Sequence, residues 1–94
     1  MTETDTSARL VAEALAEVMR SRRRAAGLNQ TEMADKAGID PKHYQAMENG
    51  FVSYRDRKPA NPQLDKLVKL AHGFETTVPD LMSDVFSRIE IELG

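Results

Sequence analysis

The sequence of 94 residues contains no cysteine, so disulfide bonds, thiolate metal sites and thiol nucleophiles are excluded together. No apolar run approaches the roughly 18 residues that a membrane-spanning helix needs. The start of the chain, residues 1–7, is polar and acidic, unlike the basic and then apolar start of a secretory signal. We therefore expect a soluble cytoplasmic protein that has no membrane partner.

The signatures of common catalytic sites are also missing. The sequence has no Gly-rich phosphate loop and no nucleophile with a base in a recognisable context, and its carboxylates are scattered. His43 and His72 have neither a cysteine nor a second histidine four residues away, so surface positions are more plausible for them than metal ligation. We expect no enzymatic activity, no metal and no cofactor.

The length of the chain allows one compact core and no second one. We expect a disordered tail over residues 1–7 and a single domain over residues 8–94. Charge is unevenly distributed: residues 1–19 hold one basic residue and four acids, residues 20–58 nine and five, and residues 59–94 three and six. The basic middle suits one anion-facing side, with another side left for self-association or a partner, although a solvated charged face explains it equally well.

Apolar residues recur at helical spacing over residues 8–26, and Gly27 ends this first helix. Asn29 and Glu32 have the spacing of a capping box, in which each side chain bonds to the backbone of the other residue. The second helix is therefore expected to begin at Gln30.

A three-residue turn separates the second helix from the third. Gly38 supplies the bend, Ile39 is placed to fill the gap between the two helices, and Asp40 acts as the next N-cap. Pro41 then occupies the first helical position of a third helix over residues 41–49. The two helices and their turn have helix-turn-helix spacing.

After an irregular loop over residues 51–61, Asn61 and Pro62 predict the start of a fourth helix that reaches Gly73, and Thr77 caps a fifth helix over residues 78–93. No segment reads as a strand, so the expected fold class is all-α with five helices. The apolar positions expected to face the core beyond the first helix are Met33, Ala34, Ala37, Tyr44, Met47, Leu64, Leu67, Val68, Leu70 and Ala71.

Several short motifs at fixed spacing resemble the DNA-binding domains of lambdoid phage repressors and Cro proteins, the Xre-type helix-turn-helix family. They are Gly27-Leu28-Asn29-Gln30, Met33-Ala34, Lys36, Gly38-Ile39, Met47-Glu48-Asn49-Gly50, Arg57-Lys58-Pro59 and Leu67-Val68-Lys69-Leu70-Ala71. The resemblance covers residues 19–82 and implies a five-helix, lambda-repressor-like domain. In such a domain the recognition helix, residues 41–49, enters the major groove of double-stranded DNA.

The chemistry of the exposed positions agrees with this reading. Lys42 can donate to guanine, Gln45 can pair with adenine, and Ala46 can contact a thymine methyl group, so these three are the expected base contacts. Pro41 stands where phage repressors often have glutamine, so the operator cannot be copied from a relative. The expected contacts to the DNA backbone are Gln30, Thr31, His43, Asn49, Tyr54, Arg55, Arg57 and Lys58.

The resemblance also implies a structural ion pair between Arg23 and Glu48. Useful specificity in such domains needs two copies that read the half-sites of a palindromic operator, so we expect a homodimer. Phe86, Ile89 and Leu93 extend the apolar stripe of the last helix and are the expected dimer interface, although the first helix can cover Phe86 instead. The expected function is transcription regulation, most simply repression; the alternative is the antitoxin of a toxin–antitoxin pair, which binds a toxin and represses its own operon.

Overall fold

A computed structural model describes the backbone of residues 3–50 and 61–93 and the side chains of residues 6–50 and 61–89. These residues form five helices and no strand, which confirms the all-α expectation for the part of the chain described. The helices are α1 (Glu3–Ala25), α2 (Gln30–Ala37), α3 (Pro41–Asn49), α4 (Leu64–Gly73) and α5 (Val78–Leu93). None of them is long and apolar enough to cross a membrane.

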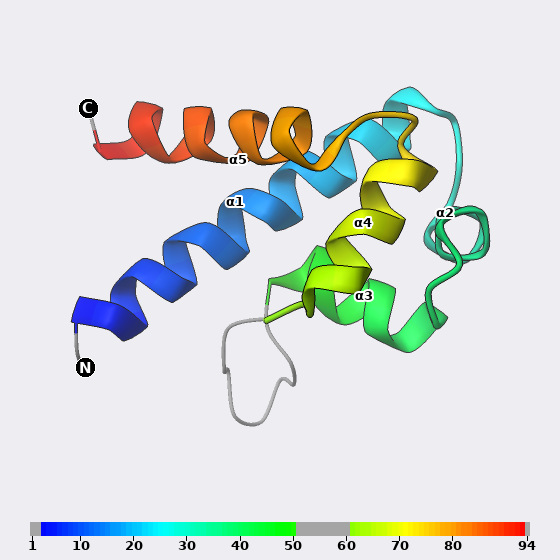
Figure 1. Ribbon diagram of the computed structural model, residues 1–94, viewed down its shortest axis with the longest axis horizontal. Coiled ribbons are helices and arrows are strands. Elements are labelled where there is room, and N and C mark those ends of the chain that lie inside the picture. The colour runs from blue at the N-terminus through cyan, green and yellow to red at the C-terminus, as the bar shows by residue number, and fades with distance from the viewer. Residues whose placement is uncertain (1–2, 51–60, 94) are drawn as a thin grey trace.

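The long helix α1 organises the fold. It packs against α5 and against α3, while α2 packs against α3 and α4 (Figure 1). The first turn of α1 and the last turn of α5 lie at the same end of the molecule, away from α2 and α4. Within the helix-turn-helix, α3 is therefore held by α1 and α2 by α4.

The predicted caps define both helices of the helix-turn-helix. The Asn29 side chain accepts a hydrogen bond from the Glu32 backbone N–H at 2.8 Å, and Glu32 Oε1 accepts one from the Asn29 N–H at 3.0 Å. Asp40 Oδ1 accepts from the backbone N–H of Lys42 at 2.9 Å. Gly38 has φ +72°, a left-handed conformation that a residue without a Cβ adopts at no steric cost. The capping box and the three-residue turn are confirmed.

Two helix starts differ from expectation. Helix α1 begins at Glu3, so most of the segment expected to be a disordered tail is helical. A polar composition does not by itself prevent helix formation, and no Gly or Pro interrupts the chain before Gly27. Helix α4 begins at Leu64 with Gln63 as its N-cap, two residues after Pro62, so the expected start at Asn61 and Pro62 was wrong.

The core is built from the apolar stripes of all five helices. Its largest fully buried apolar side chains include Tyr44, Met19, Met33 and Leu70, and Ile39 from the turn is buried with them as expected. Gly73 lies so close to α2 that a Cβ at this position would stand 2.9 Å from the Ala37 Cα. This close approach fixes α4 against α2.

The fourth helix buries less than the periodicity suggested. Leu64 and Val68 were expected in the core, but they are 75% and 56% exposed. Residues 64 and 68 share one side of α4, because positions four apart lie one turn above each other. Of the five expected positions on α4, only Leu67, Leu70 and Ala71 belong to the core or pack against it.

One ion pair connects α1 to α3 inside the protein. The Arg23 guanidinium reaches Glu48 with Nη2 at 2.7 Å from Oε1 and Nε at 2.9 Å from Oε2. The Arg23 and Glu48 side chains are 14% and 0% exposed. Two parallel hydrogen bonds to a carboxylate are the strongest arrangement that arginine can make, so the expected pair is present and nearly closed to solvent.

The environment of this pair shifts the pKa values of the groups in and around it. Burial alone would raise the pKa of Glu48, but the polar groups beside the carboxylate, the hydrogen-bonded Arg23 guanidinium first among them, outweigh burial and hold that pKa below the ordinary 4.5. The hydrogen bond to Glu48 raises the pKa of Arg23. Burial, and then the negative charge of Glu48, raise the pKa of the Tyr44 hydroxyl, which stays neutral. The pair is therefore ionised in the folded protein at neutral pH.

We predict that Arg23→Ala destabilises the fold by about 3 to 5 kcal/mol, because removing one partner leaves a buried carboxylate without its counter-charge. Arg24→Ala, one residue along on the exposed surface of α1, is the matched control and should change little. Urea unfolding followed by circular dichroism measures both. Equal losses of stability in the two variants would contradict a buried role for Arg23.

The lowered pKa of Glu48 makes part of the stability dependent on pH. The folded state favours the ionised carboxylate, so this contribution is complete above the ordinary pKa of 4.5 and is lost as the pH falls through the lower folded value. Glu48→Gln should be much less stable than the parent at neutral pH. The difference in unfolding free energy between the two proteins should become smaller on acidification to about pH 3. Urea unfolding across this pH range measures the difference in unfolding free energy. A difference that does not change with pH would contradict the prediction.

Candidate nucleic-acid interface

The two faces of α3 have different environments. Tyr44, Met47 and Glu48 are buried against the rest of the protein. Lys42, Gln45 and Asn49 are exposed, and they lie along one side of the helix because their spacing of three and four residues matches its turn. Helix α3 thus presents a polar stripe that makes no contribution to the core.

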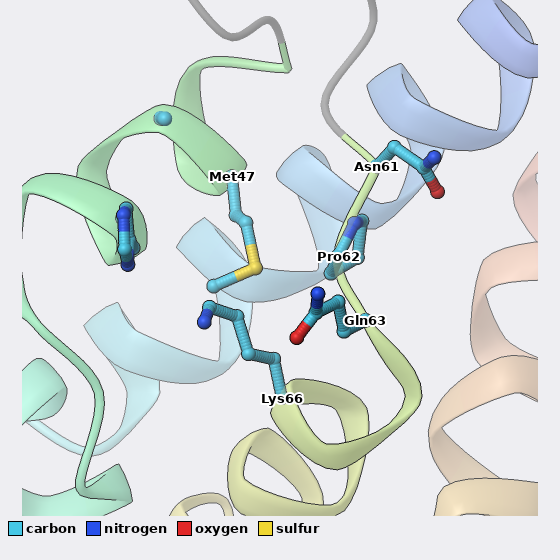
Figure 2. A pocket seen from close by; sticks show the side chains of 7 residues that line it. Met47, Asn61, Pro62, Gln63 and Lys66 are labelled. Carbon is cyan, nitrogen blue, oxygen red and sulfur yellow. The ribbon is translucent and has the colours of Figure 1, made fainter.

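Ala46 and His43 lie on the edge of this stripe. Ala46 is half-buried and His43 is exposed, and both line an open cleft between α3 and the start of α4. The cleft has a volume of about 460 Å³. Figure 2 shows the Met47 side chain on the α3 side and Asn61, Pro62, Gln63 and Lys66 on the α4 side. Three of these α4-side residues carry groups that can donate a hydrogen bond to an anion.

The start of α2 lies beside the polar stripe of α3. The Gln45 side-chain Nε2 donates a hydrogen bond to Gln30 Oε1 at 3.3 Å, and Gln30 is the first residue of α2. Thr31, the next residue, is exposed. The first N–H groups of a helix have no partner within it, and the helix dipole is positive there, so this end favours anions. The structure brings Gln30 and Gln45 together, with Thr31 next to Gln30.

Acidic residues near this surface are engaged by other groups. Asp40 accepts from backbone N–H groups at the start of α3, Glu32 accepts from Asn29, and Glu48 is held by Arg23. Hydrogen bonding spreads the negative charge of these carboxylates onto the protein instead of leaving it free to repel a phosphate. In the described part of the chain, no group of His, Asp and Glu side chains is placed to hold a metal ion.

Sequence reasoning missed a contact at the end of α3. Arg20 was not among the expected site or ion-pair residues, but its Nη1 donates to the Glu48 backbone carbonyl at 2.6 Å. The last carbonyls of a helix lack partners within it, and a cation there also complements the dipole. Arg22, also not singled out from the sequence, has its Nη2 atom 3.6 Å from Asp84 Oδ2 on α5. Spacing along the sequence gave no signal for either contact, because each depends on how two helices cross.

Asn61, Gln63 and Lys66 were also absent from the expected site. Their position directly after the loop that follows α3 was the available signal. Four expected backbone contacts, Tyr54, Arg55, Arg57 and Lys58, lie outside the described residues.

The expected dimer residues have different environments on α5. Phe86 is 50% exposed, whereas Ile89 packs partly buried against the core. The Leu93 side chain lies outside the described residues. On this helix, Phe86 therefore remains as a large apolar group available to a partner.

Comparison with known families agrees with the fold and the surface. The Helix-turn-helix family model matches residues 19–81, about two thirds of the chain and all of α2, α3 and α4. No curated protein and no solved structure gives a significant match. The matched family is a family of DNA-binding domains and not of enzymes. The chain belongs to the Xre and lambda repressor-like helix-turn-helix family of DNA-binding transcription regulators.

Proposed function

We propose that the protein binds double-stranded DNA sequence-specifically and represses transcription, with α3 lying in the major groove. The observation that carries the proposal is the polar stripe of Lys42, Gln45 and Asn49, which is exposed and lies beside the N-terminus of α2. A protruding helix with amide and ammonium groups fits the width of the major groove and the pattern of donors and acceptors on base edges.

Base reading is assigned to the exposed stripe and its apolar edge. Lys42 donates to guanine, Gln45 pairs with adenine, and Ala46 contacts a thymine methyl group. Pro41 at the start of the same helix has no side-chain donor and reads no base by hydrogen bonding.

Backbone contacts surround the base-reading stripe. The start of α2, at Gln30 and Thr31, faces one strand, and Asn49 and His43 contact phosphates along α3. The cleft beside His43 brings Lys66 close to the same path. Further contacts to the DNA backbone are proposed for four residues on the basis of their residue type and sequence position alone: Tyr54, Arg55, Arg57 and Lys58.

The proposed active form is a homodimer on a palindromic operator, because one recognition helix contacts only a few base pairs. The half-exposed Phe86 on α5 supports an interface there, since transfer of a large apolar side chain out of water is favourable. Leu93 is included in the proposed interface because of its position in the sequence. Ile89 is already partly buried within the chain and contributes at most its remaining surface.

The alternative is an antitoxin that represses its own operon. It shares the DNA face, and the exposed Phe86 on α5 then receives a toxin instead of a second copy. Purification of the tagged protein from its native host separates the two, because an antitoxin should bring down a small toxic protein in stoichiometric amount.

We predict that Gln45→Ala costs about 1 to 3 kcal/mol on a selected operator and relaxes preference at one base pair. Thr31→Ala should weaken binding to all sequences about equally, because a phosphate contact carries no base information. Binding titrations against an operator selected from random duplexes, and against its single-base variants, measure both effects. A Lys42→Ala, Gln45→Ala double variant that binds the operator as tightly as the parent would show that α3 does not read bases.

We predict that the protein sediments as a dimer at micromolar concentration and that Phe86→Asp sediments as a monomer with unchanged helicity. Ser87→Asp places the same charge on the next, exposed position of α5 and should remain dimeric. Ile89→Asp is a poor test, because Ile89 also packs on the core. A Phe86→Asp variant that stays dimeric would show that Phe86 is not part of the interface. A monomeric parent that binds a palindrome cooperatively would show that the interface forms only on DNA.

A further inference from the structure

An open cleft lies between α3 and the start of α4, beside the surface proposed to bind DNA. Ala46 and Met47 line it from α3, and Pro62 and Lys66 line it from the α4 side (Figure 2). Its volume of about 460 Å³ lies within the range of sites that hold small molecules, about 300 to 1,000 Å³. The cleft is therefore large enough for an organic ligand of metabolite size.

Part of the lining is apolar. Met47 is only 4% exposed and belongs to the core, so the side of the cleft that it forms is continuous with the protein interior. Ala46 and Pro62 are half-buried and add two further apolar side chains. Contact with such a surface is favourable for an apolar group, because that group leaves water. A ligand that fills the cleft should thus carry an apolar body.

The polar part of the lining complements negative charge. Lys66 and His43 are basic, and the side-chain amides of Asn61 and Gln63 add groups that donate hydrogen bonds. None of the described residues in the lining is an acid. Gln63 is the N-cap of α4 but makes no capping hydrogen bond with its side chain, so the helix does not engage its amide. This part of the cleft therefore favours an anion.

Lys66 has no acidic partner within the part of the chain that the structure describes, although it is half-buried. Lys69, three residues further along α4, has its Nζ 3.9 Å from Asp65 Oδ2. Figure 2 shows the Lys66 side chain extending toward Met47. One ammonium group matches the single charge of a carboxylate better than the double charge of a phosphate monoester. The chemistry of the cleft thus fits a carboxylate joined to an apolar body.

We propose that this cleft binds a small organic acid with an apolar body and that the bound acid competes with DNA. The carboxylate lies against Lys66 and His43, and the apolar body covers Met47. His43 and Ala46 line the cleft and are also assigned to the DNA face, so the ligand and the duplex exclude each other. The inference rests on the proposed role of α3 as the DNA reader, and it adds an effector site to the same domain.

Phenylacetate is the probe, because it joins a carboxylate to an apolar ring. Two relatives each remove one feature: phenylacetamide lacks the charge, and acetate lacks the ring. In a nitrogen-15 correlation spectrum of the full chain, phenylacetate should cause saturable shifts of the backbone amides of Ala46, Met47 and Lys66. The two relatives should bind about 10-fold more weakly, since one loses a charged hydrogen bond and the other loses apolar contact. A parent that shows no saturable shift with phenylacetate would overturn the inference.

A pair of variants on α4 tests the assigned charge. Lys66→Met removes the ammonium group and keeps an unbranched side chain, so it should bind phenylacetate about 10-fold more weakly than the parent. Lys69→Met is the matched control, because Lys69 lies on the same helix and outside the lining of the cleft, and it should bind like the parent. Equal affinity of the two variants for phenylacetate would overturn the inference.

Competition is measured on the tightest duplex that the parent selects from a random pool. The apparent dissociation constant for this duplex should rise about twofold when phenylacetate equals its own dissociation constant, and about 11-fold at about ten times that concentration. Sodium acetate at the same concentration controls for the salt dependence of DNA binding. Saturation of the cleft by phenylacetate without loss of DNA affinity would overturn the competition.

Two outcomes separate this inference from the proposed function. If Lys66→Met weakens DNA binding but the parent binds no phenylacetate, the cleft serves a DNA phosphate alone, so the effector site fails and DNA binding through α3 stands. If the parent selects no duplex, the proposed function fails and the competition fails with it, while the spectra still decide whether the cleft binds the acid.

Discussion

The buried pair between Arg23 and Glu48 is the interaction on which the geometry of the protein depends. It joins the C-terminal part of α1 to the end of α3, and Arg20 adds a second hydrogen bond from α1 to the Glu48 carbonyl. A closed pair with two parallel hydrogen bonds tolerates little displacement, since its partners lose both hydrogen bonds and hydration when they separate. The angle at which α3 projects from the domain is therefore tied to α1 and not to the short turn alone.

Two polar contacts hold the helix-turn-helix, one inside the protein and one at its surface. Glu48 is held by Arg23 from α1, and Gln30 at the start of α2 accepts a hydrogen bond from Gln45 on the exposed stripe of α3. The start of α2 and the exposed face of α3 are thus held in one arrangement before any ligand binds, which reduces the ordering cost of binding.

Much of this architecture follows from local rules that operate within a few residues. The caps at Asn29 and Asp40 and the bend at Gly38 define α2 and α3, because backbone N–H groups and steric freedom act over one helical turn. The Arg23–Glu48 pair was anticipated only through family resemblance, since nothing in the spacing of two residues on separate helices reports their contact.

Features that depend on how helices cross were not predictable in the same way. The exposure of Leu64 and Val68, the partial burial of Ile89 and the role of Arg20 all depend on which side of a helix meets its neighbour. Hydrophobic periodicity gives the width of an apolar stripe but not its exact centre. The observed starts of α1 and α4 differ from the predicted ones, because polar residues and a proline are compatible with more than one helix boundary.

The division of α3 into a buried and an exposed face has an evolutionary consequence. Among its nine residues, Tyr44, Met47 and Glu48 are buried and maintain the fold, whereas Lys42 and Asn49 are exposed. Under the proposed role of α3 as the DNA reader, selection for folding and selection for a target act on different positions, so a lineage can acquire a new target without passing through unstable intermediates. Gln45 is the exception, since its hydrogen bond to Gln30 makes the history of one position depend on the other.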